Sequence, residues 1–189
     1  YDRALTKREL ISNIKGKDAL LCLLTDKIDE EIIKANINLK IIANYAVGFD
    51  NIDLQAAKKY NIPVTSTPGV LTETVAEHAV ALMMAIARRI PEADQFTKRG
   101  KYKGWGPLMF LGSNIAGKTL GILGLGRIGS AVAERASFGL GMKVLYYDVN
   151  RNPDFEKKYN AKYADVSTLL KSSDFVTVHV PLLPSTKHL

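Results

Sequence analysis

The sequence predicts an α/β fold in which parallel strands alternate with helices. Three observations support this class. Short apolar runs alternate with segments of helical spacing, turn or cap residues separate the two kinds of segment, and the alternation restarts in the second half of the chain. Because parallel strands need a crossover between them, each intervening helix is expected to pack on a sheet.

The first half predicts three strands separated by helices. The strands are expected over residues 18–24, 39–43 and 63–66, and the helices over 28–35 and 54–60. Thr6 and Glu9 have the spacing of a capping box, which predicts an earlier helix reaching about residue 14. Asp53 suits the N-cap of the helix over 54–60, and Asn61 can close it. No strand precedes the first helix, so we expect further chain before Tyr1.

The longest predicted helix covers residues 72–90 and is expected to end at Pro91. Its apolar residues spread over more than one face, so we expect cover on two sides, as between two domains. Residues 92–117 are rich in glycine, lack clear periodicity and are expected to form a linker or an arm. The expected domains are therefore residues 1–91 and 92–189.

The second half restarts the alternation of strands and helices. Strands are expected over residues 119–123, 143–147 and 175–180, a short strand over 161–164, and helices over 128–138 and 166–171.

Residues 124–129 (Gly-Leu-Gly-Arg-Ile-Gly) match the G-x-G-x-x-G motif directly between a predicted strand and a predicted helix. That context is typical of dinucleotide binding. Gly124 permits a tight turn, Gly126 lets a pyrophosphate approach the backbone, and Gly129 lets the helix pack against the strand. The helix N-terminus supplies free N–H groups to the phosphates. The alternatives are glycines used only for packing, or a kinase glycine loop, for which the antiparallel strands and the following lysine are not seen.

Asp148 ends the next strand, about 20 residues after the motif, where an acidic side chain can accept hydrogen bonds from the adenosine ribose. Its charge would repel the extra phosphate of NADP, so the expected cofactor is NAD. Arg127 can reach the pyrophosphate, although a solvent-facing side chain is also consistent with its position. Ile128 completes the candidate cofactor-binding set.

The chain has a formal net charge of +7, and its densest basic cluster lies over residues 98–103, with Trp105 nearby. Basic residues beside aromatics can bind single-stranded nucleic acid. The remaining basic residues are interleaved with acidic ones, which favours a solvated surface or attraction for a small anion. We therefore expect no nucleic-acid partner.

Cys22 is the one cysteine of the chain, which excludes an internal disulfide framework and a multi-cysteine metal site. It lies within an apolar run and is expected to be a buried small hydrophobe. No apolar stretch is long enough for a membrane span and no leader is visible, so a cytoplasmic protein without membrane contact is expected.

Four segments together resemble the D-isomer-specific 2-hydroxyacid dehydrogenases. They are residues 44–53 (Asn-Tyr-Ala-Val-Gly-Phe-Asp-Asn-Ile-Asp), 74–78 (Thr-Val-Ala-Glu-His), 117–129 (Gly-Lys-Thr-Leu-Gly-Ile-Leu followed by the glycine motif) and 174–181 (Asp-Phe-Val-Thr-Val-His-Val-Pro). Residues 105–112 are similar to glyoxylate/hydroxypyruvate reductases within that family. The resemblance implies a flavodoxin-like substrate domain and a doubly wound Rossmann NAD-binding domain, both incomplete.

The resemblance also implies roles for five residues outside the glycine motif. Backbone N–H groups of Val47 and Gly48 would hold the substrate carboxylate, in agreement with a glycine loop at the carboxyl end of a parallel strand. Val75 matches a position beside the nicotinamide, although its spacing alone indicates a core residue. Val180 and Pro181 resemble the wall under the adenine and the nicotinamide ribose.

The reaction implied by the resemblance is hydride transfer from NADH to C2 of a small 2-oxo acid, with glyoxylate or hydroxypyruvate expected first. Its catalytic arginine, glutamate and histidine are expected beyond Leu189, so no catalytic residue is assigned and the 189-residue chain alone is expected to be inactive. His78 is expected to pack at an interface, His179 inside a buried strand, and His188 in solvent.

Other readings remain open. The protein would act on D-lactate or 3-phosphoglycerate if it is a different member of the family, or it would be a non-enzymatic NAD-responsive binding protein. The resemblance further implies a homodimer through the nucleotide domain, with residues 92–117 as a candidate arm.

Overall fold

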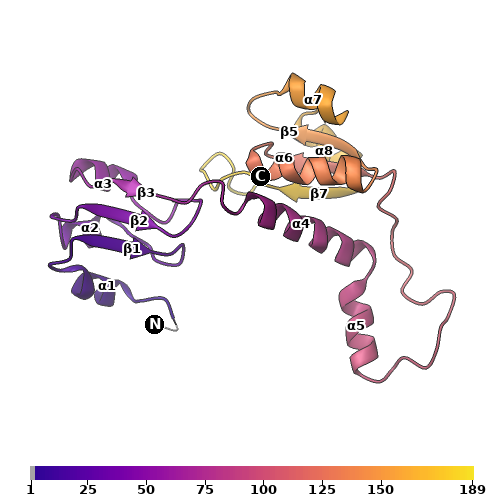
Figure 1. Ribbon diagram of the computed structural model, residues 1–189, viewed down its shortest axis with the longest axis horizontal. Coiled ribbons are helices and arrows are strands. Elements are labelled where there is room, and N and C mark those ends of the chain that lie inside the picture. Colours follow the sequence, from indigo (N-terminus) through magenta and orange to yellow (C-terminus); the bar gives the residue numbers. More distant parts are fainter. Residues whose placement is uncertain (1–2) are drawn as a thin grey trace. The chain divides into compact units, whose positions relative to one another are not determined.

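The computed structural model describes residues 3–189, which form two compact units (Figure 1). Within the described residues, the first unit comprises residues 3–71 and Pro181–Leu189, and the second comprises Thr72–Val180. The division falls at Leu71, whereas the sequence placed it after residue 91. The difference arises because helix α4 (Thr72–Ala87) contributes Ala76 and Ala87 to the core of the second unit.

The first unit is a three-stranded parallel sheet in the order β1-β2-β3. Its elements are α1 (Lys7–Ile14), β1 (Ala19–Cys22), α2 (Glu30–Lys34), β2 (Ile41–Asn44), α3 (Leu54–Lys59) and β3 (Val64–Thr65). The predicted capping box between Thr6 and Glu9 is confirmed, as is the N-cap at Asp53, whose side chain accepts the N–H of Ala56. Asn61 closes α3 with a left-handed backbone, at a φ of 54°.

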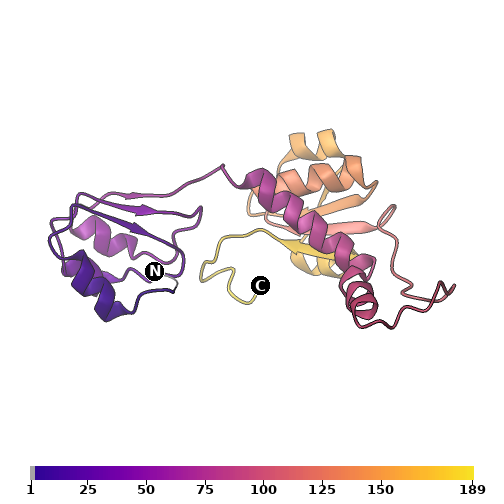
Figure 2. The same ribbon diagram turned by 60° about the horizontal axis from the view of Figure 1, so that its bottom comes forward.

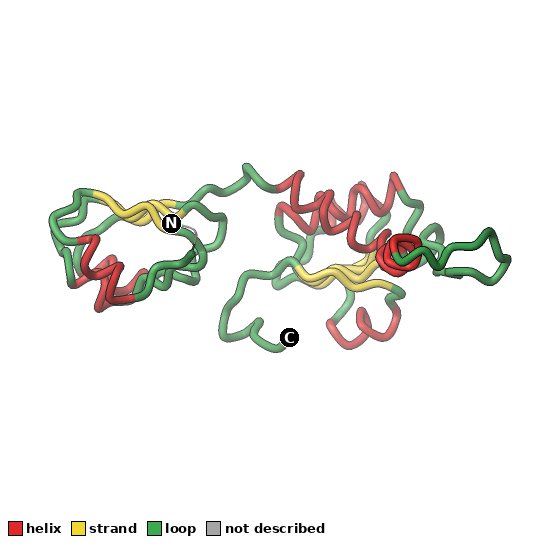
Figure 3. Tube along the Cα trace, turned by 90° about the horizontal axis from the view of Figure 1, so that it is seen from below, coloured by secondary structure: helices red, strands yellow, loops and turns green. Residues whose placement is uncertain are grey.

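The core of the first unit lies between its sheet and its helices. Ile32 of α2 and Ile42 of β2 are fully buried there, and α1 adds Leu10. Figure 3 shows the helices of this unit on one side of its strands. On the opposite face of the sheet, Leu21 is 73% exposed.

The helix predicted over residues 72–90 is α4, which ends at Ala87, and a further helix, α5 (Ile90–Lys98), extends into the region predicted as a linker or an arm. The break lies at Arg89, whose φ of 55° is left-handed, and Pro91 stands in the first turn of α5. The prediction that Pro91 ends a helix was therefore wrong, because proline is well tolerated where the first helical N–H groups have no partner. One side of α4 packs on the second unit, whereas Leu82 and Ile86 on the other side are exposed.

Residues 99–114 form a long loop that returns to the end of α4, in the region predicted as a linker or an arm (Figure 1). Ser113 donates its N–H to the carbonyl of Ala87 at 2.8 Å. Phe110 packs edge-on against Phe96 of α5, with ring centroids 5.2 Å apart. These contacts tie the base of the loop, whereas Trp105 within it is 82% exposed.

The second unit carries a four-stranded parallel sheet in the order β6-β5-β4-β7. Its strands are β4 (Thr119–Leu123), β5 (Lys143–Tyr147), β6 (Lys162–Tyr163) and β7 (Phe175–Val178), and its later helices are α6 (Arg127–Glu134), a π-helical turn over Arg135–Gly139, α7 (Pro153–Tyr159) and α8 (Val166–Ser172). Figure 2 shows α4 beside α6, and Figure 3 shows helices on both faces of this sheet. The predicted α/β class is confirmed, and α7, like α5, is a helix that was not predicted from the sequence.

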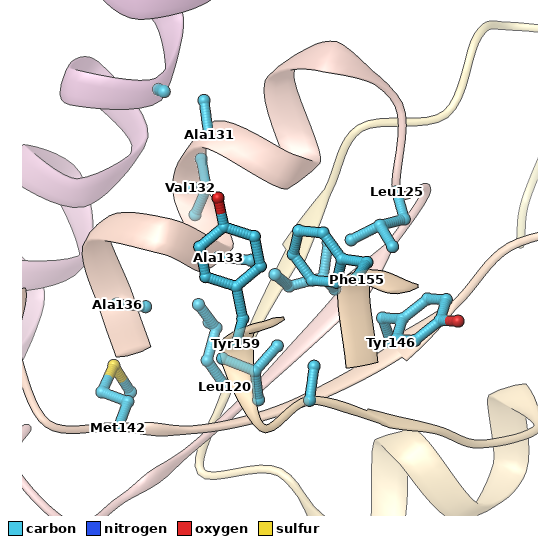
Figure 4. Packing of buried hydrophobic residues seen from close by; sticks show 14 of the residues in the cluster. Leu120, Leu125, Ala131, Val132, Ala133, Ala136, Met142, Tyr146, Phe155 and Tyr159 are labelled. Carbon is cyan, nitrogen blue, oxygen red and sulfur yellow. The ribbon is translucent and has the colours of Figure 1, made fainter. Parts of the chain in front are cut away.

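Buried side chains from α6, α7, β4 and β5 pack together in the second unit (Figure 4). Tyr146 is fully buried, and its ring lies edge-on to that of Phe155, with centroids 6.2 Å apart. Phe155 in turn packs on Tyr159 at 4.5 Å, so α7 is fixed on the sheet by aromatic contacts.

Within residues 3–189, no helix combines the length and the apolar composition that a membrane crossing requires.

Candidate functional site

The glycine motif begins where β4 ends. Gly124 donates its N–H to the carbonyl of Tyr147 at 2.8 Å and has a φ of +95°, which side chains rarely adopt. A Cβ at Gly124 would lie 2.8 Å from the backbone carbonyl of His179, just beyond β7. Only glycine fits this turn, which brings the loop against the carboxyl end of β7.

The other two glycines of the motif meet opposite surroundings. A Cβ at Gly129 would lie 2.0 Å from the carbonyl oxygen of Gly124, so the close approach of α6 to the loop excludes any side chain there. A Cβ at Gly126 would meet nothing within 4 Å. The backbone of Gly126 therefore borders open space, as the approach of a pyrophosphate requires.

The N-terminus of α6 offers free donors beside that space. Ser130 donates to the carbonyl of Gly126 at 2.9 Å, and the N–H groups of Gly126, Arg127 and Ile128 donate no hydrogen bond within the described chain. These N–H groups carry the positive end of the helix dipole, which favours an anion. The Arg127 side chain is exposed, whereas that of Ile128 packs against the core and leaves only its backbone to a ligand.

Asp148 lies next to the glycine loop. Its Oδ2 accepts the N–H of Leu125 at 2.7 Å, and its Oδ1 accepts the N–H of Asn150 at 3.2 Å. Each carboxylate oxygen keeps further acceptor capacity, so ribose hydroxyls can still be bound. The sequence did not predict the bond to Leu125, through which Asp148 also holds the loop itself.

The strand order places this loop at a topological switch point. When the four strands are numbered by their order along the chain, their order across the sheet is 3-2-1-4. The direction in which strands are added therefore reverses between β4 and β7. Ligands of open α/β sheets bind at such a point, beyond the carboxyl ends of the strands. Val180 also lies here, since its Cγ1 would be 2.9 Å from a Cβ at Gly124.

Val75 and Pro181 lie in different surroundings. Val75, in the first turn of α4, lines a cavity of about 410 Å³ together with Thr177 and His179. Pro181 belongs to the first unit, where its carbonyl accepts the hydroxyl of Thr186 at 2.5 Å.

A second set of free donors occurs in the first unit, in the loop after β2. Asn44 is 2% exposed, and its Nδ2 donates to the carbonyl of Gly48 at 2.8 Å and to Oδ1 of Asn51 at 3.0 Å. Asn51 donates in turn to the carbonyl of Leu23 at 3.0 Å. With the loop held in this way, the N–H groups of Val47 and Gly48 donate to no acceptor among the described residues, and both are exposed.

These free N–H groups suit a carboxylate, in agreement with the role that the resemblance implies for this loop. The two asparagines that hold the loop were missed from the sequence. The signal for Asn44 was a polar residue directly after a buried strand, but its partners come from loops that only the fold brings together.

The histidines of the described chain do not form an acid/base pair. His179 lies beyond the end of β7 rather than inside a buried strand as predicted, and its Nε2 is 2.8 Å from the hydroxyl of Thr177. Partial burial lowers the pKa of His179, which keeps the ring neutral. His78 and His188 are exposed, and no histidine of residues 3–189 forms an ion pair with a carboxylate.

Cys22 is 1% exposed, as predicted, and burial raises the pKa of its thiol to about 11. The thiol is therefore protonated and unreactive at neutral pH.

Comparison with known proteins gives a consistent family. The model of the family described as D-isomer specific 2-hydroxyacid dehydrogenase, NAD binding domain, matches residues 80–189. The chain is 53% identical to the glyoxylate reductase of Korarchaeum cryptofilum over 185 residues, covering 97% of this chain and 55% of that protein. It is also 53% identical to the glyoxylate reductase of Thermococcus litoralis over 184 residues, covering 95% of this chain and 55% of that protein. The chain thus spans about half the length of these curated relatives.

Solved structures agree with the sequence relatives. The TT0316 protein of Thermus thermophilus matches with a TM-score of 0.91 at 41% identity, covering 97% of this chain and 57% of that one. The D-lactate dehydrogenase of Aquifex aeolicus, solved with NAD and lactic acid, matches with a TM-score of 0.84 at 35% identity, covering 93% of this chain and 52% of that one.

Proposed function

The chain belongs to the D-isomer specific 2-hydroxyacid dehydrogenases, and we propose that the whole protein is an NADH-dependent reductase of small 2-oxo acids. Glyoxylate and hydroxypyruvate are the first expected substrates, because the relatives at 53% identity are named glyoxylate reductase. The observation that carries the proposal is the glycine loop at the switch point, with Asp148 bonded to it and free N–H groups facing open space.

We assign the cofactor-binding roles as follows. The N–H groups of Gly126, Arg127 and Ile128 hold the pyrophosphate, Gly124 and Gly129 shape the loop, and Asp148 accepts the ribose hydroxyls. Val75 lies beside the nicotinamide, and Val180 and Pro181 form the wall under the adenine and the nicotinamide ribose. When bound, NADH supplies the hydride that reduces the 2-oxo carbon.

The substrate carboxylate is held by the N–H groups of Val47 and Gly48. The fixed loop suits this role, because Asn44 and Asn51 orient the backbone before any ligand arrives. Reduction of the 2-oxo group also needs a proton donor and a cation that polarises the carbonyl. We expect that histidine, its glutamate partner and the arginine outside residues 1–189.

The activity is tested on the whole protein, as its native source makes it, by following the loss of NADH absorbance after glyoxylate is added. Consumption of NADH with formation of glycolate supports the proposal. A protein that binds NADH but turns over no 2-oxo acid would instead be a non-enzymatic NAD-responsive binding protein.

A second substrate class is D-lactate or 3-phosphoglycerate and their 2-oxo acids. The match to a D-lactate dehydrogenase solved with lactic acid favours D-lactate over 3-phosphoglycerate. Turnover rates on glyoxylate, hydroxypyruvate, pyruvate and phosphohydroxypyruvate, compared as kcat/KM, separate these members of the family. We expect the highest value with glyoxylate or hydroxypyruvate.

We also propose that the protein is a homodimer through its nucleotide domain. Large apolar side chains are exposed on α4 and along the loop over residues 99–114, among them Ile86 at 72%, Trp105 at 82% and Leu108 at 80%. Exposed apolar surface of this kind marks an association site. Sedimentation of the whole protein at twice its chain mass supports the dimer, and a monomer over the same concentrations contradicts it.

A cytoplasmic location and the absence of a nucleic-acid partner complete the proposal. The buried, protonated Cys22 is compatible with a reducing compartment. Many of the basic side chains are engaged in ion pairs with acidic ones, such as Lys118 with Asp174 at 2.8 Å. Salt-dependent retention of the protein on DNA would contradict the absence of a nucleic-acid partner.

A further inference from the structure

The loop after β5 carries a cation as well as an acid. Asp148 ends this strand, and Arg151 follows three residues later. In nucleotide-binding sheets an acidic residue at this point binds the ribose of NAD, whereas a nearby arginine can accommodate the 2′-phosphate of NADP. The loop therefore contains an acid that suits NAD and an arginine that suits NADP. The orientation of the two side chains determines which of them faces the cofactor site.

The two side chains are directed to opposite neighbours of β5. Asp148 accepts the N–H of Leu125, in the loop after β4. Arg151 lies over the ring of Tyr163 in β6, with its Cζ 6.0 Å from the ring centroid. Because β5 lies between β4 and β6 in the sheet, the acid faces the glycine loop and the guanidinium lies on the other side.

Glu156 of α7 fixes the guanidinium in that position. Nε of Arg151 donates to Oε1 of Glu156, and Nη2 of Arg151 donates to Oε2 of Glu156, both at 2.8 Å. A two-point pair of this kind fixes the direction of the guanidinium as well as its distance.

A residue of the core holds Glu156 in place. The hydroxyl of the fully buried Tyr146 donates to its Oε1 at 2.9 Å and accepts the N–H of Asn152 at 2.7 Å. In consequence the Glu156 side chain is only 16% exposed, although that of Arg151 is 62% exposed. The Arg151 guanidinium and the Tyr146 hydroxyl hold the pKa of Glu156 down to about 2, so the pair is charged at any physiological pH.

We propose that Glu156 is a cofactor-specificity residue, which holds Arg151 away from the 2′-phosphate of NADPH and thereby supports the preference for NADH. The proposal rests on the proposed function, since it concerns the same dinucleotide site. Asp148 disfavours the phosphate by its charge, and Glu156 withholds the cation that would otherwise compensate that charge.

The test measures the Kd of NADH and of NADPH by calorimetric titration of the whole protein and three variants, Glu156→Gln, Arg151→Gln and the double variant. Glutamine keeps an oxygen that can accept the Tyr146 hydroxyl, but it lacks the charge that fixes Arg151. We expect Glu156→Gln to lower the Kd of NADPH roughly tenfold, the gain of about one charge-assisted hydrogen bond. The Kd of NADH should change by less than about twofold, and the double variant should lose the gain.

Arg151→Gln alone gives an independent check, because Arg151 is exposed and its replacement leaves the core intact. A guanidinium held by Glu156 contributes nothing to phosphate binding, so the Kd of NADPH should equal that of the wild type. A weaker binding of NADPH by this variant would overturn the proposal, because Arg151 would already reach the phosphate.

Two other results would also overturn it: an unchanged Kd of NADPH in Glu156→Gln, or a gain that survives in the double variant. If these occur while the wild type binds NADH, only the role of Glu156 fails. If the wild type binds neither dinucleotide, the proposed function fails together with it. Thermal unfolding of each variant shows whether a changed Kd comes from a changed fold.

Discussion

Gly126 and Gly129 lie three residues apart and serve different purposes. At Gly129 the carbonyl of Gly124 leaves no room for a Cβ, so the requirement is one of packing between helix and loop. At Gly126 there is room, and its φ of −71° suits any residue. Glycine at that position therefore has no role in folding that the structure reveals, and binding is the remaining reason for it.

This difference gives a matched pair of substitutions. Gly129→Ala should lower the free energy of unfolding by about 1–3 kcal/mol, as overpacking against backbone does. Gly126→Ala should change it by less than about 0.5 kcal/mol and should raise the Kd of NADH about tenfold, because the methyl group occupies the approach of the pyrophosphate. Urea unfolding and NADH titration of both variants check this. Normal NADH binding by Gly126→Ala would contradict the assignment.

The residue scale was partly predictable. The spacing of the three glycines and Asp148 was sufficient to locate the loop, because each is defined by its position relative to a strand. The bond from Leu125 to Asp148 and the network between Asn44 and Asn51 were not predictable. Each joins loops that lie far apart in the sequence, and only the pairing of parallel strands brings them to the same edge.

At the scale of elements, the sequence located strands better than helix ends. The strands over Thr119–Leu123 and Lys143–Tyr147 have the predicted bounds, because a buried parallel strand is a continuous apolar run. The end of α4 was predicted too late and α5 was not predicted, because the break between them depends on the left-handed backbone of Arg89 and not on hydrophobicity. Helix α7 was missed because only Phe155 and Tyr159 of its seven residues are buried.

Helix α3 offers a test of how such ends are determined. Asn61 follows it with a φ of 54°, which asparagine and glycine tolerate and alanine does not. Its N–H donates to the carbonyl of Lys58 at 3.1 Å, a bond that any non-proline residue keeps. Asn61→Ala should therefore destabilise the protein by about 1 kcal/mol, and Asn61→Gly serves as the matched control with little or no loss. Equal unfolding midpoints for the two variants would contradict this account.

At the scale of the whole molecule, the chain carries two sets of free backbone donors on two compact units. One set lies in the loop after β2 and the other at the start of α6. Both suit anions, and the formal net charge of +7 has the sign that attracts a dinucleotide and a carboxylate. The parallel class of each sheet was predictable from the alternation of strands and helices. The assignment of α4 to the second unit was not, because an apolar helix that lies between two sheet-forming segments in the sequence can pack on either sheet.

The glycine loop and Asp148 are expected to bind NADH in preference to NADPH. We would titrate NADH and NADPH into the whole protein and into its Asp148→Ala variant. The wild type should bind NADH more tightly than NADPH, by roughly tenfold or about 1.4 kcal/mol. Asp148→Ala should weaken NADH binding and reduce the difference in affinity between the two dinucleotides. Equal affinity of the wild type for both dinucleotides, or binding of neither, would contradict the account.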